Sequence, residues 1–253
     1  MYEAVKYTRN FVKEVIVRID FMSPLEKNKN KIQARLNKEI MKLFSIPETQ
    51  ETIMQDVEIK MVNGKPVSEM KTEKMKEFHY KSATGEKELV ITREAMYISY
   101  KKYDTFEDLK TDFMKIASHL LEIETDLQIK RIGLRYINSV ELSNGEPTDW
   151  DGYIDDRLIS ALNFYEDKKS ISRAFTVLEL NNGDFKLRYQ FGMHNPDYPT
   201  PIYRKVFILD MDAFYEGLIE KIKEVEEYLE NFHGEIQRLF EASIKQGLRD
   251  VMS

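Results

Sequence analysis

Two arginines in the segment RIGLRYIN are the side chains best suited to bind a charged ligand. Side chains alternate between the two faces of a β-strand, so Arg131, Gly133 and Arg135 share one face of this predicted strand. Tyr136 and Asn138 then lie on the opposite face, and all four polar residues are candidate binding residues. Two guanidinium groups with a glycine between them suit a phosphate or a carboxylate. In the alternative interpretation, both arginines pair with Asp or Glu across the sheet, as half-buried arginines usually do.

Asp210 and Asp212 are a second candidate for ligand binding. If a strand continues through both residues, their carboxylates share a face and could hold Mg²⁺. We expect instead that Asp212 caps a helix beginning at Ala213, where its carboxylate would accept hydrogen bonds from backbone N–H groups. No further carboxylates of a metal site can be identified in the sequence, so no metal site and no cofactor is predicted.

The histidines and the known catalytic motifs add little chemistry. The four histidines are His79, His119, His194 and His233, and none has a second histidine three or four residues away. His194 stands in the proline-rich loop GMHNPDYPTP, which is a position typical of functional residues. The sequence contains no G-x-S-x-G, Walker A or G-x-G-x-x-G motif, which counts against hydrolase, NTPase and dehydrogenase activities.

The elements that would position these residues predict an α+β protein with a mainly antiparallel sheet, because hairpins dominate and βαβ alternation is absent. Periods of two predict strands over 14–21, 56–62, 76–81, 88–92, 96–103, 129–142, 171–180, 184–191 and 203–210. Helical spacing predicts helices over 25–45, 105–121 and 154–163, and a long helix from Ala213 almost to the end of the chain. Thr105 is the expected N-cap of the second helix, and Asn182-Gly183 the expected hairpin turn.

The turn-rich segment 143–153 is the predicted boundary between two closely packed lobes. The N-terminal lobe would span residues 1–142 and the C-terminal lobe residues 154–253. One integrated domain is the alternative, because 253 residues also suit a single large core.

The C-terminal helix has the most regular pattern. Seven apolar residues step by four and three, as in the a and d positions of heptads; they are Leu218, Ile222, Val225, Leu229, Phe232, Ile236 and Leu239. Such a stripe cannot stay exposed, so the helix either braces the sheet of its own chain or pairs with a second chain. A homodimer or another protein partner through this helix is therefore one of two open interpretations.

Composition and charge exclude several classes of protein. The chain has no cysteine, so disulfide scaffolds, iron–sulfur clusters and thiol catalysis are excluded. No apolar run is long enough to span a membrane, and the charged first twenty residues do not resemble a secretory signal, so we expect a cytoplasmic protein. Residues 1–45 carry ten Lys and Arg against five acids. The basic patch of Lys27, Lys29, Lys31 and Arg35 could contact a polyanion, although a net charge of -6 favours an ordinary solvated face.

Five segments together resemble an uncharacterised, sporadically distributed prokaryotic family of about this length. They are Glu14–Phe21, Tyr100–Phe106, Arg131–Asn138, Leu209–Asp212 and the closing segment Phe232–Ile244. The intact RIGLRYIN strand is the most specific of them, and Phe232 departs from the leucine of the family pattern. The resemblance implies no activity. The patchy occurrence of the family implies mobile or defence-linked genes.

Three functions follow as hypotheses. The first is a non-catalytic binding or assembly protein, a component of a mobile defence-type locus that recognises nucleic acid or a protein partner. The second is a metal-dependent enzyme acting on a phosphorylated or nucleotide substrate, with Arg131 and Arg135 as clamp and Asp210 and Asp212 as metal ligands. The third is a structural homodimer.

Overall fold

The computed structural model describes residues 7–25, 32–62 and 65–253. Nine antiparallel strands form one sheet in the order β2-β3-β4-β5-β1-β6-β9-β8-β7. The strands are β1 (Val12–Phe21), β2 (Ile46–Val62), β3 (Lys65–Lys81), β4 (Lys87–Ile91), β5 (Ala95–Tyr100), β6 (Ile129–Glu141), β7 (Ala174–Asn181), β8 (Lys186–Met193) and β9 (Val206–Ile219). The helices are α1 (Ala34–Ile40), α2 (Phe106–Ile123), α3 (Ser160–Phe164), α4 (Ile222–Ser243) and α5 (Gln246–Met252). The predicted α+β fold with a mainly antiparallel sheet and a long C-terminal helix is confirmed.

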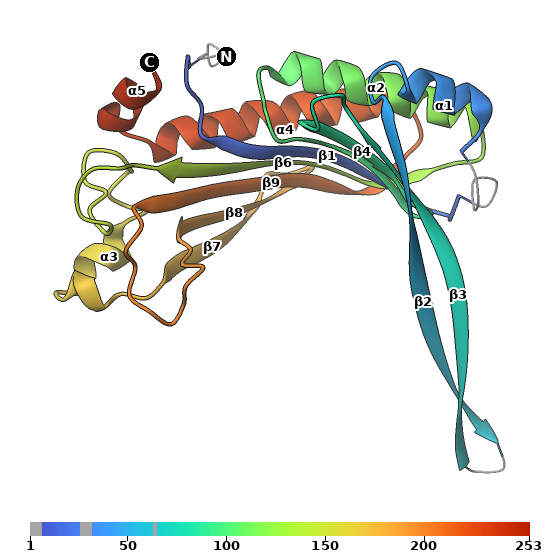
Figure 1. The fold of residues 1–253 in the computed structure, drawn as a ribbon, viewed down its shortest axis with the longest axis horizontal. Coiled ribbons are helices and arrows are strands. Elements are labelled where there is room, and N and C mark those ends of the chain that lie inside the picture. Colours follow the sequence, from blue (N-terminus) through green and yellow to red (C-terminus); the bar gives the residue numbers. More distant parts are fainter. Residues whose placement is uncertain (1–6, 26–31, 63–64) are drawn as a thin grey trace.

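The molecule has two layers over most of its length. Helices α1, α2 and α4 lie along one face of the curved sheet, and the other face is open (Figure 1). Alternation along β1 explains this arrangement, because Val15, Val17 and Ile19 are fully buried under the helices while Arg18 is exposed on the open face. No helix among the described residues is long and apolar enough to cross a membrane.

Several predicted elements have different bounds in the structure. The helix predicted over 25–45 is only α1, and residues 26–31 of that range lie outside the described residues. The helix predicted over 154–163 is the single short turn of α3. Thr105 does cap α2, with its Oγ1 accepting from the Asp108 N–H at 3.2 Å, and Asn182-Gly183 does form the hairpin turn, with Gly183 at φ +76°.

The helix predicted from Ala213 is wrong, because β9 continues to Ile219 and α4 begins only at Ile222. The period of two persists beyond Asp212, with Met211 and Ala213 fully buried. Continued pairing with β6 satisfies the backbone groups of both strands, which outweighs the helical spacing of the later apolar residues. The predicted capping role of Asp212 therefore fails, and Leu218 lies in a strand with 45% of its surface exposed.

The apolar stripe of α4 packs on the sheet of its own chain. Val225, Leu229 and Phe232 are fully buried and Ile236 nearly so, while Ile222 and Leu239 pack at the margin of the core. Of the two interpretations of this helix, the bracing role describes the contacts that the structure shows.

The segment predicted to separate two lobes joins β6 to the C-terminal elements. Strands β6 and β9 pair directly from Ile129 and Ile219 to Glu141 and Val206, so the sheet is continuous across that boundary. The division of the chain into two lobes stays a prediction. The two ends of the chain lie together, because the Arg9 N–H donates to the Met252 carbonyl at 3.0 Å (Figure 1).

Strands β2 and β3 leave the body as a two-stranded ribbon, which we call the arm (Figure 1). They pair over their full lengths, but β3 pairs with β4 only from Phe78 to Lys81. The part of β3 over residues 65–77 therefore pairs only with β2, and extends for about 40 Å at about 3.3 Å per residue. The sequence patterns predicted only the strands over 56–62 and 76–81, because the rest of the arm is rich in charged and polar residues.

Candidate functional site

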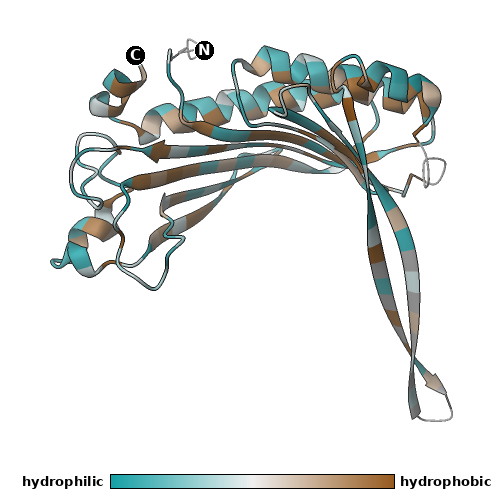
Figure 2. Ribbon diagram, in the orientation of Figure 1, coloured by the Kyte–Doolittle hydropathy of each residue, from teal (hydrophilic) through white to brown (hydrophobic). Residues whose placement is uncertain are grey.

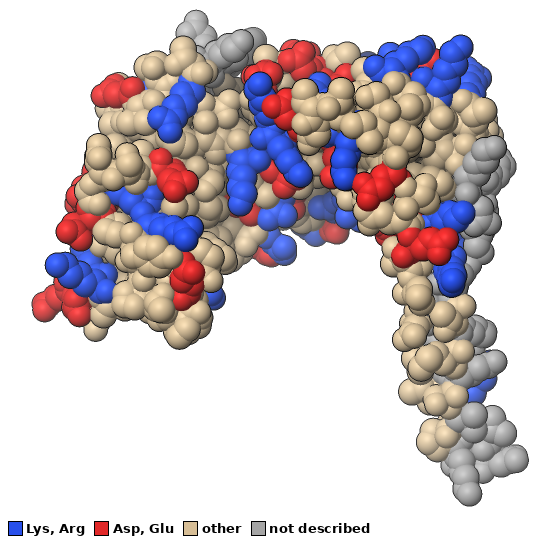
Figure 3. Space-filling view, viewed as in Figure 1, with Lys and Arg blue, Asp and Glu red and all other residues tan. Residues whose placement is uncertain are grey.

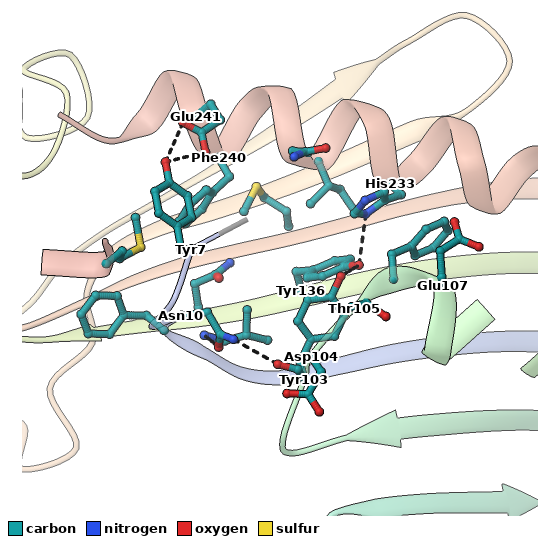
Figure 4. A pocket seen from close by; sticks show the side chains of 18 of the residues that line it. Tyr7, Asn10, Tyr103, Asp104, Thr105, Glu107, Tyr136, His233, Phe240 and Glu241 are labelled. Carbon is teal, nitrogen blue, oxygen red and sulfur yellow. Dashed lines mark hydrogen bonds between the residues drawn. The ribbon is translucent and has the colours of Figure 1, made fainter. Parts of the chain in front are cut away.

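A pocket opens between the sheet and α4, where side chains from four parts of the chain meet (Figure 4). Tyr136 comes from β6, His233 from α4, Tyr103 from the loop before α2, and Tyr7 from the segment before β1. The cavity has a volume of about 420 Å³, which lies within the range of about 300–1,000 Å³ found for small-molecule sites.

A chain of hydrogen bonds forms the polar part of this pocket. The hydroxyls of Tyr103 and Tyr136 are 3.0 Å apart, and the Tyr136 hydroxyl lies 3.2 Å from His233 Nδ1. The His233 ring stacks on Phe106, with centroids 4.0 Å apart and planes at 8°. Burial raises the pKa of Tyr103 to about 12 and lowers the pKa of His233 below its usual value. At neutral pH the tyrosines therefore keep their protons and His233 is uncharged.

The charged groups that line this pocket are all carboxylates among the described residues; they belong to Asp104, Glu107, Glu230 and Glu241. Lys110, just outside, bridges Glu107 and Glu230. Arg249 lies 3.0 Å from Glu241, which also accepts from the Tyr7 hydroxyl at 2.9 Å. Asp104 makes no ion pair with any described residue. The pocket therefore carries an excess of negative charge.

A second cavity, on the open face of β6, contains the predicted arginines. Arg131, Gly133 and Arg135 line a cleft of about 430 Å³ together with Arg18 from β1 and Asp212 from β9. The strand thus separates the predicted binding residues, with the arginines on the open face and Tyr136 and Asn138 in the pocket on the helix-covered face. The predicted alternation along β6 is confirmed, but the four residues do not form one site.

Arg131 and Arg135, the two predicted arginines, are both paired across the sheet. Arg135 donates to Asp210 from Nε at 2.8 Å and from Nη2 at 2.6 Å. Arg131 lies 3.5 Å from an Asp20 oxygen and 3.9 Å from an Asp212 oxygen, and its guanidinium lies 4.9 Å from the centre of the Phe214 ring. These are the contacts that the alternative interpretation of the two arginines predicted.

Gly133 makes room for Arg131. A Cβ at this position would lie 3.2 Å from Arg131 Nη1, so the guanidinium folds back over the glycine.

Asp210 and Asp212 do share the open face, as expected if the strand continued. The Asp210 carboxylate is bound by Arg135, and burial raises the pKa of Asp212 although Arg131 and Arg135 oppose the shift. In the part of the chain that the structure describes, no cluster of three or more His, Cys, Asp or Glu side chains is placed to hold a metal ion.

His194 and Arg35, two further predicted site residues, lie apart from both cavities. His194 is exposed, and its nearest aromatic neighbour is Phe175, with ring centroids 6.3 Å apart. The adjacent Asn195 is buried and donates to the carbonyls of Ser172 and Thr200, so it holds the proline-rich loop in place. Arg35 pairs with Glu122 at 3.2 Å on the surface. Lys27, Lys29 and Lys31 lie outside the described residues.

The arm presents a row of exposed apolar side chains on one face, which we call the arm stripe. Its members lie on the same face because Val57 is directly opposite Met70, and residues two apart along β2 share that face. The stripe consists of Ile53, Val57, Ile59, Met61 and Met70, which are between 52% and 70% exposed. Hydrophobic positions recur along β2 in Figure 2, and on the face that Figure 3 shows the coloured charged side chains of the arm gather mainly at its base.

No model of a known protein family matches the chain, and no curated protein matches it. The resemblance centred on Arg131–Asn138 is therefore still a hypothesis.

The sequence predicted two of the pocket residues, Tyr136 and Asn138, as binding residues, and it did not indicate that the others belong to a site. Tyr103 and Tyr7 stand in loops, where no periodicity shows which way a side chain points. His233 was seen only as a histidine without a metal-binding neighbour. The stripe could have been found, because Ile53, Val57, Ile59 and Met61 keep a period of two through a polar segment.

Proposed function

We propose that this protein is a non-catalytic assembly protein that joins a second copy of itself through the arm. The observation that carries the proposal is the arm stripe, five large apolar side chains exposed on a ribbon that projects from the body. Exposed apolar patches of this kind mark interaction sites in soluble proteins.

The arm is poorly stabilised by its own chain. Isolated two-stranded ribbons are marginally stable in water, and β2 is also an edge of the sheet, with one side of its backbone unpaired. Long unpaired edges are sites where another chain adds on. A contact over the stripe would cover apolar surface and support the ribbon at the same time.

A second copy suits the size of the stripe. Stable interfaces bury about 800 Å² on each partner. A ribbon about 40 Å long and about 10 Å wide offers a flat face of about 400 Å², about half of that area, which suits a weak dimer that forms only at high protein concentration. Two-fold contacts are the commonest arrangement of homo-oligomers, and such a contact would cover both stripes and leave neither exposed.

Charge at the base of the stripe also suits a second copy. On the stripe face, Glu51 belongs to β2, and Lys74 and Lys76 belong to β3. In a dimer with its two-fold axis along the arms, β2 of each copy faces β3 of the other. Glu51 of one copy then approaches the two lysines of the other, and the two-fold axis repeats this contact of opposite charges, so that two such contacts lie at the base of the arms.

Nucleic acid is less well supported as a partner. The cleft arginines are already paired with carboxylates, at 2.6 Å for Arg18 with Asp20 and 2.6 Å for Arg135 with Asp210. On the face of the body that Figure 3 shows, blue and red side chains are intermixed over most of the surface. The metal-dependent enzyme is also less well supported. Arg135, its proposed phosphate clamp, and Asp210, its proposed metal ligand, neutralise each other. The link to a mobile defence-type locus is a part of the proposal that depends on the resemblance alone.

Sedimentation velocity from micromolar to hundred-micromolar concentration tests the proposal. The wild-type chain should change from monomer to dimer over this range, and Ile59→Glu should stay monomeric. At micromolar concentration, where both proteins are monomers, the variant should melt like the wild type, because Ile59 is 70% exposed in the single chain. Thr52→Glu is the matched control, since Thr52 is exposed on the other face of the arm; it should dimerise like the wild type. A wild-type chain that stays monomeric throughout would overturn self-assembly, as would a dimer that Ile59→Glu does not weaken.

A further inference from the structure

The geometry points to a binding site for an organic cation with an aromatic body in the pocket between β6 and α4. This site is separate from the arm, because β6, which lines the pocket, lies on the other side of β1 from β2 and β3 in the order of the sheet (Figure 1).

The charge of the pocket walls indicates that the ligand is a cation. Four carboxylates line the pocket, and no Lys or Arg among the described residues does. Lys110 and Arg249 neutralise part of this charge from outside. Asp104, at the mouth, has no cationic partner among the described residues and is exposed. A positively charged group is attracted here, and a phosphate or carboxylate is repelled.

The walls indicate the shape of the ligand. Tyr103, Tyr136, Phe106 and Phe240 contribute aromatic rings to one cavity (Figure 4). Aromatic faces attract cations and stack on flat rings. A volume of about 420 Å³ admits a molecule with a fused ring pair and a short side chain.

An amide oxygen in the pocket wall gives the site a polar anchor. The amide nitrogen of Asn138 donates to the Leu209 carbonyl at 3.1 Å, while its amide oxygen has no partner among the described residues. Asn138 is only 4% exposed and lines the pocket. This oxygen is not a fully buried atom, and an N–H group of a ligand can donate to it from the pocket.

Three matched probes test the inference: tryptamine, tryptophol and indole-3-propionate. They share the indole ring and differ in charge, which is positive, zero and negative at pH 7.5. Isothermal titration calorimetry should rank their affinities in that order, with tryptamine at least about tenfold tighter than indole-3-propionate. Equal or tighter binding of the carboxylate would overturn the inference, and so would no binding of any probe at millimolar concentration.

Three variants test whether the probes bind in this pocket. Asp104→Asn should weaken tryptamine about three- to tenfold and leave tryptophol unchanged, since only the charge is removed. Asp126→Asn removes an exposed carboxylate elsewhere and should change neither affinity. Tyr136→Phe should weaken both probes by changing the pocket floor. If Asp104→Asn and Asp126→Asn behave alike and Tyr136→Phe binds like the wild type, the probes bind elsewhere and the inference is wrong.

Discussion

Arg135 lies directly opposite Asp212 in the pairing of β6 with β9, yet its guanidinium binds the diagonal neighbour Asp210. Both bonds are short, at 2.8 and 2.6 Å, and the Asp210 side chain is 9% exposed. Asp212 is left with the more distant Arg131, at 3.9 Å. The Asp210 carboxylate is therefore held by two hydrogen bonds, whereas the Asp212 carboxylate is half-buried and has only the longer contact with Arg131.

We expect Asp210→Asn to destabilise the protein by about 1–3 kcal/mol, the usual cost of losing hydrogen bonds between charged groups that are partly exposed. Urea unfolding measures this difference. Glu179→Gln is the matched control, because it removes an exposed pair with Arg188 on the same sheet; it should cost less than about 0.5 kcal/mol. Equal effects of the two variants would contradict the assignment of the Arg135–Asp210 pair as a structural one.

Asp212→Asn, unlike Asp210→Asn, should stabilise the protein at neutral pH. Burial raises the pKa of Asp212 in the folded chain above its unfolded value, so ionised Asp212 lowers stability at high pH, and this cost disappears as the pH falls through the folded pKa. The variant should be more stable than the wild type at pH 7.5 and equal to it near pH 3.5, as measured by unfolding at both values. A variant less stable than the wild type at pH 7.5 would show that Arg131 needs this carboxylate.

His233 should make the protein less stable in mild acid. Burial lowers its pKa, although Glu107 and Glu230 oppose the shift, so the unfolded chain binds a proton near pH 6.5 that the folded chain binds only at lower pH. Stability attributable to His233 is therefore complete above pH 7 and is lost as the pH falls below about 6.5. His233→Phe keeps a ring against Phe106 and cannot be protonated, so its melting temperature should fall less between pH 7.5 and 5.5. Parallel pH profiles for the two proteins would contradict the burial of a neutral histidine.

Substitutions at Leu229 and Leu218 distinguish the observed helix, α4, from the longer helix that the sequence predicted. Leu229→Ala should cost about 2–5 kcal/mol, since the side chain is fully buried between α4 and the sheet. Leu218→Ala, which the heptad pattern placed on the same stripe, should cost less than about 1 kcal/mol because Leu218 lies exposed in β9. Similar losses on thermal or urea unfolding would favour the predicted helix over the observed strand.

The sequence was sufficient for the class of fold and for the faces of its central strands. The alternation of buried residues through β1 and β6 and the cap at Thr105 are local signals, and the structure confirms them. The start of the last helix was wrong because pairing of β9 with β6 decides it, and that contact joins residues far apart in the chain. The pocket could not be predicted, because Tyr7, Tyr103 and His233 meet only through the tertiary fold.

The distance between the arms of two copies tests the proposed assembly most directly. The chain has no cysteine, so Thr52→Cys carries one spin label on the arm, on the face away from the stripe, and Thr176→Cys carries one on the opposite edge strand β7. Double electron–electron resonance at hundred-micromolar protein should give a narrow distance of about 20–40 Å for Thr52→Cys, the separation expected across two packed ribbons. The distance should disappear when Ile59→Glu is added, and Thr176→Cys should not show it. An absence of any intermolecular distance for Thr52→Cys, or one that survives Ile59→Glu, would contradict assembly through the arm.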